Sequence, residues 1–188
     1  MSESDTGRIL VVDDNRDLAD LYADWLAGTY TVKTAYSGEE TLTKLDSSTD
    51  IVLLDRRMPD LSGDDVLGTI RDQGLDCRVA LVTSIEPDYD ILDLGFDDYL
   101  QKPVQSAELH DLVESLLTRT QYSEHIQEYF AVVSKKATIQ SEKDDSELAT
   151  HPEFTSVVEQ SSKLKSEIDT LQEDFTEDDF VAAFHDLD

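Results

Sequence analysis

Two hydrophobic periodicities alternate along the first 120 residues. Short apolar runs of strand length are each followed by a stretch whose apolar residues recur at helical spacing. The runs with strand character are residues 8–12, 30–35, 51–54, 78–82 and 99–100. The stretches with helical spacing are residues 15–27, 37–45, 63–71, 86–94 and 106–117. Strands that alternate with helices in this way predict a parallel sheet covered by helices on both faces.

The order of the strands is restricted by the handedness of their connections. Right-handed crossovers leave few arrangements for five strands, and we expect a flavodoxin-like, doubly wound sheet with the order 2-1-3-4-5. In such a sheet, ligands bind at the carboxyl ends of the strands, where the strand order reverses. The chemistry of this region is therefore expected at that edge.

Polar residues follow four of the five predicted strands at this edge. They are Asp13 and Asp14 after the first strand, Asp55 after the third, Thr83 after the fourth and Lys102 after the fifth. Each residue type alone is common at a strand end, as a turn residue or a helix cap. Three acids, a hydroxyl and a lysine in register across four strands predict a shared site.

Four motifs in this region resemble those of response-regulator receiver domains of two-component signalling. They are ILVVDD at 9–14, IVLLDRRMPDLSG at 51–63, VALVTS at 79–84 and FDDYLQKP at 96–103. The resemblance spans about residues 7–118 and implies a role for each matching residue. By this resemblance Asp55 is the phosphoacceptor, and Asp13, Asp14 and Asp55 hold Mg²⁺ together with the backbone carbonyl of Arg57. Thr83 is expected to be the switch hydroxyl, Tyr99 the rotating aromatic residue and Lys102 the lysine beside the phosphoryl group. The bond before Pro103 is expected to be cis.

The residue types suit these roles on physical grounds as well. Crowded carboxylates repel one another and retain protons unless a cation compensates them, and Mg²⁺ prefers oxygen ligands. Phosphorylation of Asp55 adds negative charge and strong acceptor oxygens, which would draw Thr83 inward and let Tyr99 turn in. The resemblance implies an output surface around residues 88–94 and the following strand and helix. Because 18 residues separate Thr83 from Lys102, fewer than in most of the family, we expect the helix at 88–94 to be truncated or irregular.

The remaining residues are predicted to form a helical extension. Helical character continues from residue 106 to about 136, residues 141–150 are polar and predict a loop, and a second helix follows residue 152. The positions expected to face a neighbouring helix recur in it at steps of 4, 3, 4, 3 and 4, and we call them its seam. They are Val157, Ser161, Leu164, Ile168, Leu171 and Phe175. This spacing predicts a helical hairpin or a coiled-coil dimer. Thr176 and Asp179 resemble a capping box for a short terminal helix.

These patterns divide the chain into a receiver domain over residues 1–120 and a helical domain over residues 121–188. The second part resembles the HalX domain found behind receivers in haloarchaea. That domain has no defined biochemical activity that could be carried over to this chain.

The chain is strongly acidic, with 43 Asp and Glu against 15 Lys and Arg and a net charge of -28. The acids are dispersed along the whole chain, which is how a protein stays hydrated in molar salt, and we expect a halophilic cytoplasm. No stretch approaches the ~20 apolar residues of a membrane span. The negative field also disfavours binding to nucleic acid.

The function predicted from these observations is a phosphorylation-controlled signalling module. A sensor histidine kinase donates the phosphoryl group, and the helical extension passes the state to a downstream protein partner or to a second copy in a homodimer. The alternative is a DNA-binding transcriptional regulator acting through the C-terminal helices, because acidity alone does not decide against DNA in molar salt. An independent phosphatase would carry a second Asp two residues after Asp55, where this chain has Arg57, so we expect no enzyme beyond self-phosphorylation and self-dephosphorylation.

Overall fold

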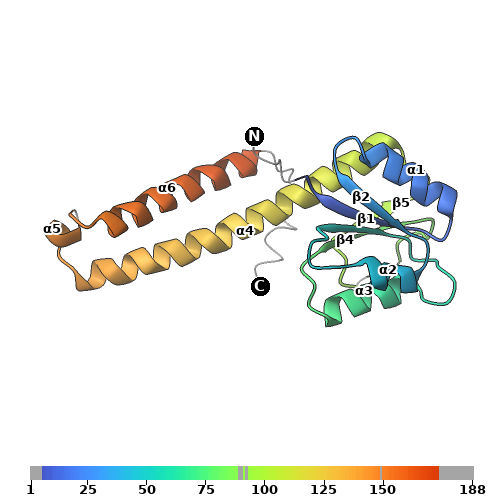
Figure 1. The fold of residues 1–188 in the computed structure, drawn as a ribbon, viewed down its shortest axis with the longest axis horizontal. Coiled ribbons are helices and arrows are strands. Elements are labelled where there is room, and N and C mark those ends of the chain that lie inside the picture. The colour runs from blue at the N-terminus through green and yellow to red at the C-terminus, as the bar shows by residue number, and fades with distance from the viewer. Residues whose placement is uncertain (1–5, 89–90, 92, 149, 174–188) are drawn as a thin grey trace. The chain divides into compact units, whose positions relative to one another are not determined.

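The computed structural model describes residues 6–88, 91, 93–148 and 150–173 of the chain. Contacts within the chain define two compact units, Met1–Leu117 and Thr118–Asp188. The first unit contains a sheet and its covering helices, and the second contains helices (Figure 1). Among the described helices, none is both long enough and apolar enough to cross a lipid bilayer.

The first unit is built on a five-stranded, entirely parallel sheet. Its strands are β1 (Arg8–Val12), β2 (Thr31–Ala35), β3 (Ile51–Leu54), β4 (Arg78–Thr83) and β5 (Asp98–Gln101). Their spatial order is β2-β1-β3-β4-β5. This order confirms the predicted flavodoxin-like fold.

Helices cover both faces of the sheet. They are α1 (Arg16–Leu26), α2 (Gly38–Lys44), α3 (Gly63–Asp72) and the first turns of α4 (Ser106–Glu142). Figure 1 shows α1 and the start of α4 on one side of the sheet and α2 and α3 on the other. Ile9 and Val11 of β1 pack on the first side, whereas Leu10 and Val12 pack on the second. Alternate side chains of the central strands are therefore buried in different layers, which is why β1, β3 and β4 are nearly continuous apolar runs. The edge strands β2 and β5 are only partly buried and carry polar residues.

Side-chain caps start the helices where the sequence changes period. The side chain of Asn15 accepts a hydrogen bond from the Leu18 N–H at the start of α1, and Ser37 accepts one from Glu40 at the start of α2. Ser62 and Asp65 form a reciprocal capping box at α3. These bonds satisfy N–H groups that have no partner inside a helix.

The connection between β4 and β5 contains no α-helix among its described residues, 84–88, 91 and 93–97. The helical spacing over 86–94 therefore predicted too much, whereas the expectation of a truncated or irregular helix at 88–94 agrees with these residues. Pro87 and Gly95 interrupt this short connection, so few consecutive residues are left for helical turns. Near the end of the connection, the carboxylate of Asp97 accepts hydrogen bonds from Arg71, Arg78 and the Val79 N–H, and these bonds anchor the segment before β5.

The second unit is a helical hairpin made of the rest of α4, the short α5 (Asp145–Leu148) and α6 (Pro152–Glu173). α4 extends six residues beyond the predicted end near 136, and α5 lies where a loop was predicted, so both expectations were wrong in detail. Tyr122 and Ile168 form the buried centre of the hairpin. Gln160 donates a hydrogen bond to Glu128 and Gln172 donates one to the Tyr122 hydroxyl, which establishes the antiparallel register.

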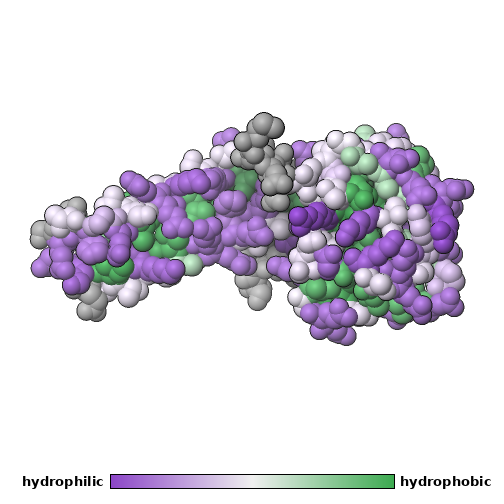
Figure 2. All heavy atoms as spheres, viewed as in Figure 1, coloured by the Kyte–Doolittle hydropathy of each residue, from purple (hydrophilic) through white to green (hydrophobic). Residues whose placement is uncertain are grey.

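The predicted seam of the second helix faces α4. Ser161, Leu164 and Ile168 are buried, and Val157 and Leu171 are half-buried. The predicted seam position Phe175 and the capping box of Thr176 and Asp179 lie outside the described residues. Hydrophilic residues cover most of the visible surface, as the acidic composition requires (Figure 2).

Candidate functional site

Three carboxylates meet at the carboxyl edge of the sheet. Asp13 and Asp14 follow β1, and Asp55 follows β3, which pairs directly with β1 through Val12 and Leu54. One carboxylate oxygen from each acid lies within 4.8 Å of the oxygens of the other two. Asp13 and Asp55 are only 3% and 6% exposed, whereas Asp14 is exposed. The cluster is therefore shielded from solvent at Asp13 and Asp55 and open to solvent at Asp14.

Lys102 reaches this acidic cluster from the end of β5. Its Nζ donates hydrogen bonds to Oδ2 of Asp13 at 2.5 Å and to Oδ2 of Asp55 at 3.1 Å. The bond between Lys102 and Pro103 is cis. One ammonium group thus contacts two of the three clustered carboxylates.

The burial of these groups and their mutual charges shift two pKa values. Burial raises the pKa of Asp13, and the hydrogen bond from Lys102 opposes that rise without cancelling it. Burial also works against the charged form of Lys102, but the hydrogen bond to Asp13 and the charges of both acids outweigh it and raise the pKa of Lys102. Lys102 is therefore a fixed positive charge at neutral pH.

The two arginines after Asp55 have different environments. Arg56 is buried and donates two hydrogen bonds to Asp64, from Nε at 2.9 Å and from Nη2 at 2.8 Å. Arg57 is exposed, and its backbone N–H donates to Oδ1 of Asp55 at 3.3 Å. The Arg56 side chain is thus held by Asp64, while Arg57 lies directly beside the acid.

Gly63 also contacts this loop, and the sequence reasoning assigned it no role at the site. Its N–H donates to the carbonyl of Arg56 at 3.0 Å. A Cβ atom on Gly63 would lie 2.2 Å from the carbonyl oxygen of Asp55 and 2.7 Å from Cα of Arg56. Because no side chain fits at these distances, the first residue of α3 must be glycine for the backbone of Asp55 to lie where it does.

Thr83 and Tyr99 are linked through the backbone of Ile85. Thr83 is fully buried at the end of β4, and its hydroxyl accepts a hydrogen bond from the Ile85 N–H at 3.4 Å. The Tyr99 hydroxyl donates to the Ile85 carbonyl at 2.7 Å. Ile85 was not among the predicted site residues, since an aliphatic side chain gives no sign of a backbone role. It connects the two residues predicted to form the switch.

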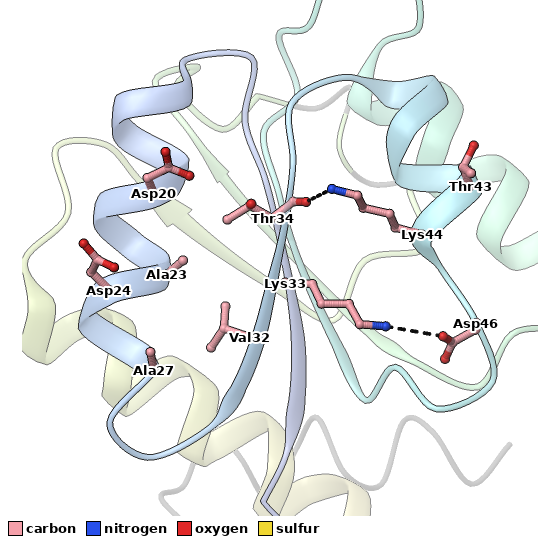
Figure 3. A pocket seen from close by; sticks show the side chains of 10 residues that line it. All are labelled: Asp20, Ala23, Asp24, Ala27, Val32, Lys33, Thr34, Thr43, Lys44 and Asp46. Atoms are coloured by element: carbon pink, nitrogen blue, oxygen red, sulfur yellow. Dashed lines mark hydrogen bonds and ion pairs between the residues drawn. The ribbon is translucent and has the colours of Figure 1, made fainter.

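A separate surface depression of about 940 Å³ runs along β2 between α1 and α2 (Figure 3). None of its lining residues is a predicted site residue. Lys44 Nζ donates to the carbonyl of Thr34 at 2.6 Å, and Lys33 lies 3.6 Å from Asp46. Lysines beside an edge strand hinder pairing with another chain, so we interpret this depression as a protected sheet edge.

Comparisons with known proteins agree with this geometry. The family model of the response regulator receiver domain matches residues 9–114, and the model of the HalX domain matches residues 118–184. A Haloferax volcanii protein named as a transcriptional regulator is 53% identical over 134 residues, which are 71% of this chain and 23% of that protein. The response regulator SaeR of Staphylococcus epidermidis is 36% identical over 62% of this chain and 53% of its own length. The chain thus spans less than a quarter of the first relative and about half of the second.

Solved receiver structures resemble the first unit. The response regulator TrrA from Thermotoga maritima, in complex with Mg²⁺ and a beryllium fluoride, has a TM-score of 0.53 and 36% identity, covering 59% of this chain and 99% of TrrA. The BeF₃-activated receiver domain of DrrB has a TM-score of 0.55 and 30% identity, covering 60% of this chain and 97% of that domain.

Proposed function

The chain belongs to the response regulator receiver family, and we propose that it works in a His-Asp phosphorelay with Asp55 as its phosphoacceptor. The observation that carries this proposal is the environment of one carboxylate. Asp55 clusters with Asp13 and Asp14, and one of its oxygens lies 3.1 Å from the ammonium of Lys102. A nucleophile, an acidic cluster and a fixed cation are the groups that transfer of a phosphoryl group to a carboxylate requires.

Asp13, Asp14 and Asp55, with the backbone carbonyl of Arg57, are the groups that would hold Mg²⁺. The donor set fits, because it consists of oxygen ligands and carries more negative charge than Lys102 alone can balance. The relative TrrA was solved with Mg²⁺. When bound, the cation offsets the charge of the carboxylates and of the phosphoryl oxygens.

Asp55 would take the phosphoryl group from a phosphohistidine of a sensor histidine kinase. A bond forms between a carboxylate oxygen of Asp55 and phosphorus, the bond between phosphorus and the imidazole nitrogen breaks, and the imidazole leaves with that electron pair. Lys102 neutralises charge on the transferred phosphoryl oxygens. Water later attacks phosphorus, releases inorganic phosphate and restores Asp55, so the chain acts on no separate substrate.

Thr83 and Tyr99 would report the phosphorylated state. A phosphoryl group on Asp55 offers strong acceptor oxygens to the Thr83 hydroxyl. When that hydroxyl moves, the Ile85 N–H loses its acceptor, and Ile85 also carries the carbonyl that holds the Tyr99 hydroxyl. A change at Thr83 is thereby coupled to the Tyr99 ring, and the helical unit passes the state to a downstream partner.

Incubation with acetyl phosphate and Mg²⁺ in molar salt tests the assignment of Asp55. The intact mass of wild type is expected to rise by one phosphoryl group, and that of Asp55→Asn is expected to stay unchanged. Asp60→Asn is the matched control, because Asp60 is exposed in the same loop and asparagine tolerates its φ of 68°. An equal mass gain in Asp55→Asn would remove Asp55 from its role.

A second candidate is DNA-binding regulation of transcription, favoured by the name of the Haloferax volcanii relative. The tail opposes this function electrostatically, because residues 121–188 carry 17 acids and 5 lysines. A gel-shift assay with the DNA upstream of the gene, titrated with salt, separates the two functions. Binding that weakens steeply with salt indicates phosphate contacts.

A further inference from the structure

α4 carries an apolar stripe that only partly contacts the core of the hairpin. Ile126, Phe130, Val133 and Ala137 recur at steps of 4, 3 and 4, which keeps them on one side of the helix. Phe130 is 62% exposed, one of three large apolar side chains that are exposed among the described residues. Ala137 is also exposed and Val133 is half-buried, whereas Ile126 packs against Tyr122 and Ile168 of the hairpin core. The part of the stripe from Phe130 to Ala137 therefore presents apolar surface that the described part of the hairpin leaves uncovered.

The neighbouring positions on this side of α4 carry no charge. Between residues 120 and 141 they are Ser123, Gln127, Ser134 and Ser141. The charged residues of the same segment lie at least about 120° around the helix from Phe130, at 3.6 residues per turn; they are Glu124, Glu128, Lys135 and Lys136. Interface cores are depleted of charge and enriched in aromatic residues. In a chain with a net charge of -28, most exposed surface is expected to carry charged side chains, and an uncharged side of a helix with an exposed phenylalanine departs from that expectation.

We propose that this side of α4 is an interface with a second copy of this chain. A basic partner would need acidic groups to pair with, and the stripe offers none. A second copy carries the same charge of -28, so two copies can pack where neither presents a charged side chain. A self-complementary stripe suits two-fold pairing, in which each α4 packs along the other.

The small core of the hairpin supports pairing with a second copy of the chain. Among the described residues of the second unit, the buried apolar side chains are Tyr122, Val132, Leu148, Leu164 and Ile168. Five side chains are few for a helical domain, whereas two hairpins packed on each other form a four-helix bundle with a shared core. The interface does not depend on phosphorylation of Asp55.

Light scattering on the full chain in molar KCl measures the mass directly. Wild type is expected at twice the 21.1 kDa of one chain. Phe130→Glu and Ala137→Glu each insert a charge into the stripe at an exposed position and are expected at the mass of one chain. Ala131→Glu inserts the same charge at the next residue, which is exposed and about 100° away around the helix. This control is expected to remain a dimer, with all three variants as helical as wild type by circular dichroism.

Three results would overturn the interface. They are a monomeric wild type, a dimer that survives both changes in the stripe, and a dimer that Ala131→Glu also dissociates. A monomer whose Phe130 is protected from solvent would mean that the same chain covers the stripe, which also overturns the proposal. Asp55→Asn is expected to dimerise like wild type, so failure of the phosphoryl-transfer proposal leaves this test intact.

Discussion

The ammonium group of Lys102 lies 2.5 Å from Oδ2 of Asp13, although 89 positions separate the two residues in the chain. The contact joins the ends of β1 and β5, which are not neighbours in the sheet. Through its second hydrogen bond, to Asp55, the same group reaches the end of β3 as well. One side chain therefore ties together three strand ends at the proposed site of phosphorylation.

Removal of this cation should affect both stability and phosphorylation. Lys102→Ala removes the ammonium donor from two buried carboxylates, and we expect the free energy of unfolding to fall by about 1–3 kcal/mol and phosphorylation by acetyl phosphate to slow. Lys33→Ala is the control, because Lys33 forms a surface pair with Asp46 at 3.6 Å and should change stability by at most about 0.5 kcal/mol. Urea denaturation at constant salt measures both values. Equal effects of the two substitutions would contradict the role of Lys102.

Removal of divalent metal should abolish phosphorylation without unfolding the chain. We expect EDTA to prevent the mass gain with acetyl phosphate, and added Mg²⁺ to restore it and to raise the melting temperature of wild type. Asp14→Asn removes an exposed oxygen donor from the cluster and should weaken that stabilisation by Mg²⁺. Asp24→Asn, an exposed acid on α1, provides the control for the loss of one charge. Stabilisation of Asp14→Asn by Mg²⁺ as large as that of wild type would argue against a metal at this acidic cluster.

Two glycines of α3 should respond oppositely to the same substitution. Gly63→Ala forces a Cβ atom to 2.2 Å from the carbonyl oxygen of Asp55, so we expect a loss of about 2–4 kcal/mol of stability and slower phosphorylation. A Cβ atom on Gly68 meets nothing within 4 Å, and Gly68→Ala should stabilise the helix by about 0.5–1 kcal/mol. Thermal unfolding of both variants checks this, and a neutral Gly63→Ala would show that the loop after Asp55 tolerates displacement.

Glu40 should make the stability depend on pH in the acid range. The hydrogen bond from Lys44 and that from the Tyr36 N–H lower the pKa of Glu40. As the pH falls, the unfolded chain takes up this proton before the folded chain does, so the contribution is present above about pH 4.3, the ordinary pKa of glutamate, and is lost as pH falls through the lowered value. Because the pair is half exposed, its size should be below about 1 kcal/mol.

The measurement for Glu40 is the difference in unfolding free energy between wild type and Glu40→Gln across this range. We expect that difference to shrink as the solution is acidified. Glu39→Gln removes a neighbouring charge that has no such pair among the described contacts, and it serves as the reference. A difference that stays constant with pH would show that the bonds to Glu40 contribute nothing to stability.

The strands and the residues at their ends could be predicted from the sequence alone. Strands buried on both faces must be continuous apolar runs, and parallel strands bring their carboxyl ends to one edge, so the positions of Asp13, Asp55 and Lys102 followed from the pattern. The seam of α6 was predictable for a similar reason, because helical spacing aligns its apolar residues.

Contacts between distant residues were decided by the tertiary structure. The fit of Gly63 against Asp55, the pairing of Arg56 with Asp64 and the bridge through Ile85 depend on backbone paths that no local pattern encodes. The absence of an α-helix among the described residues before β5 and the extra turns of α4 show the same limit, since helix ends depend on what the neighbouring segments leave room for. Hydrophobic periodicity determines which face of an element is buried, whereas the distances within a site depend on how those elements pack together.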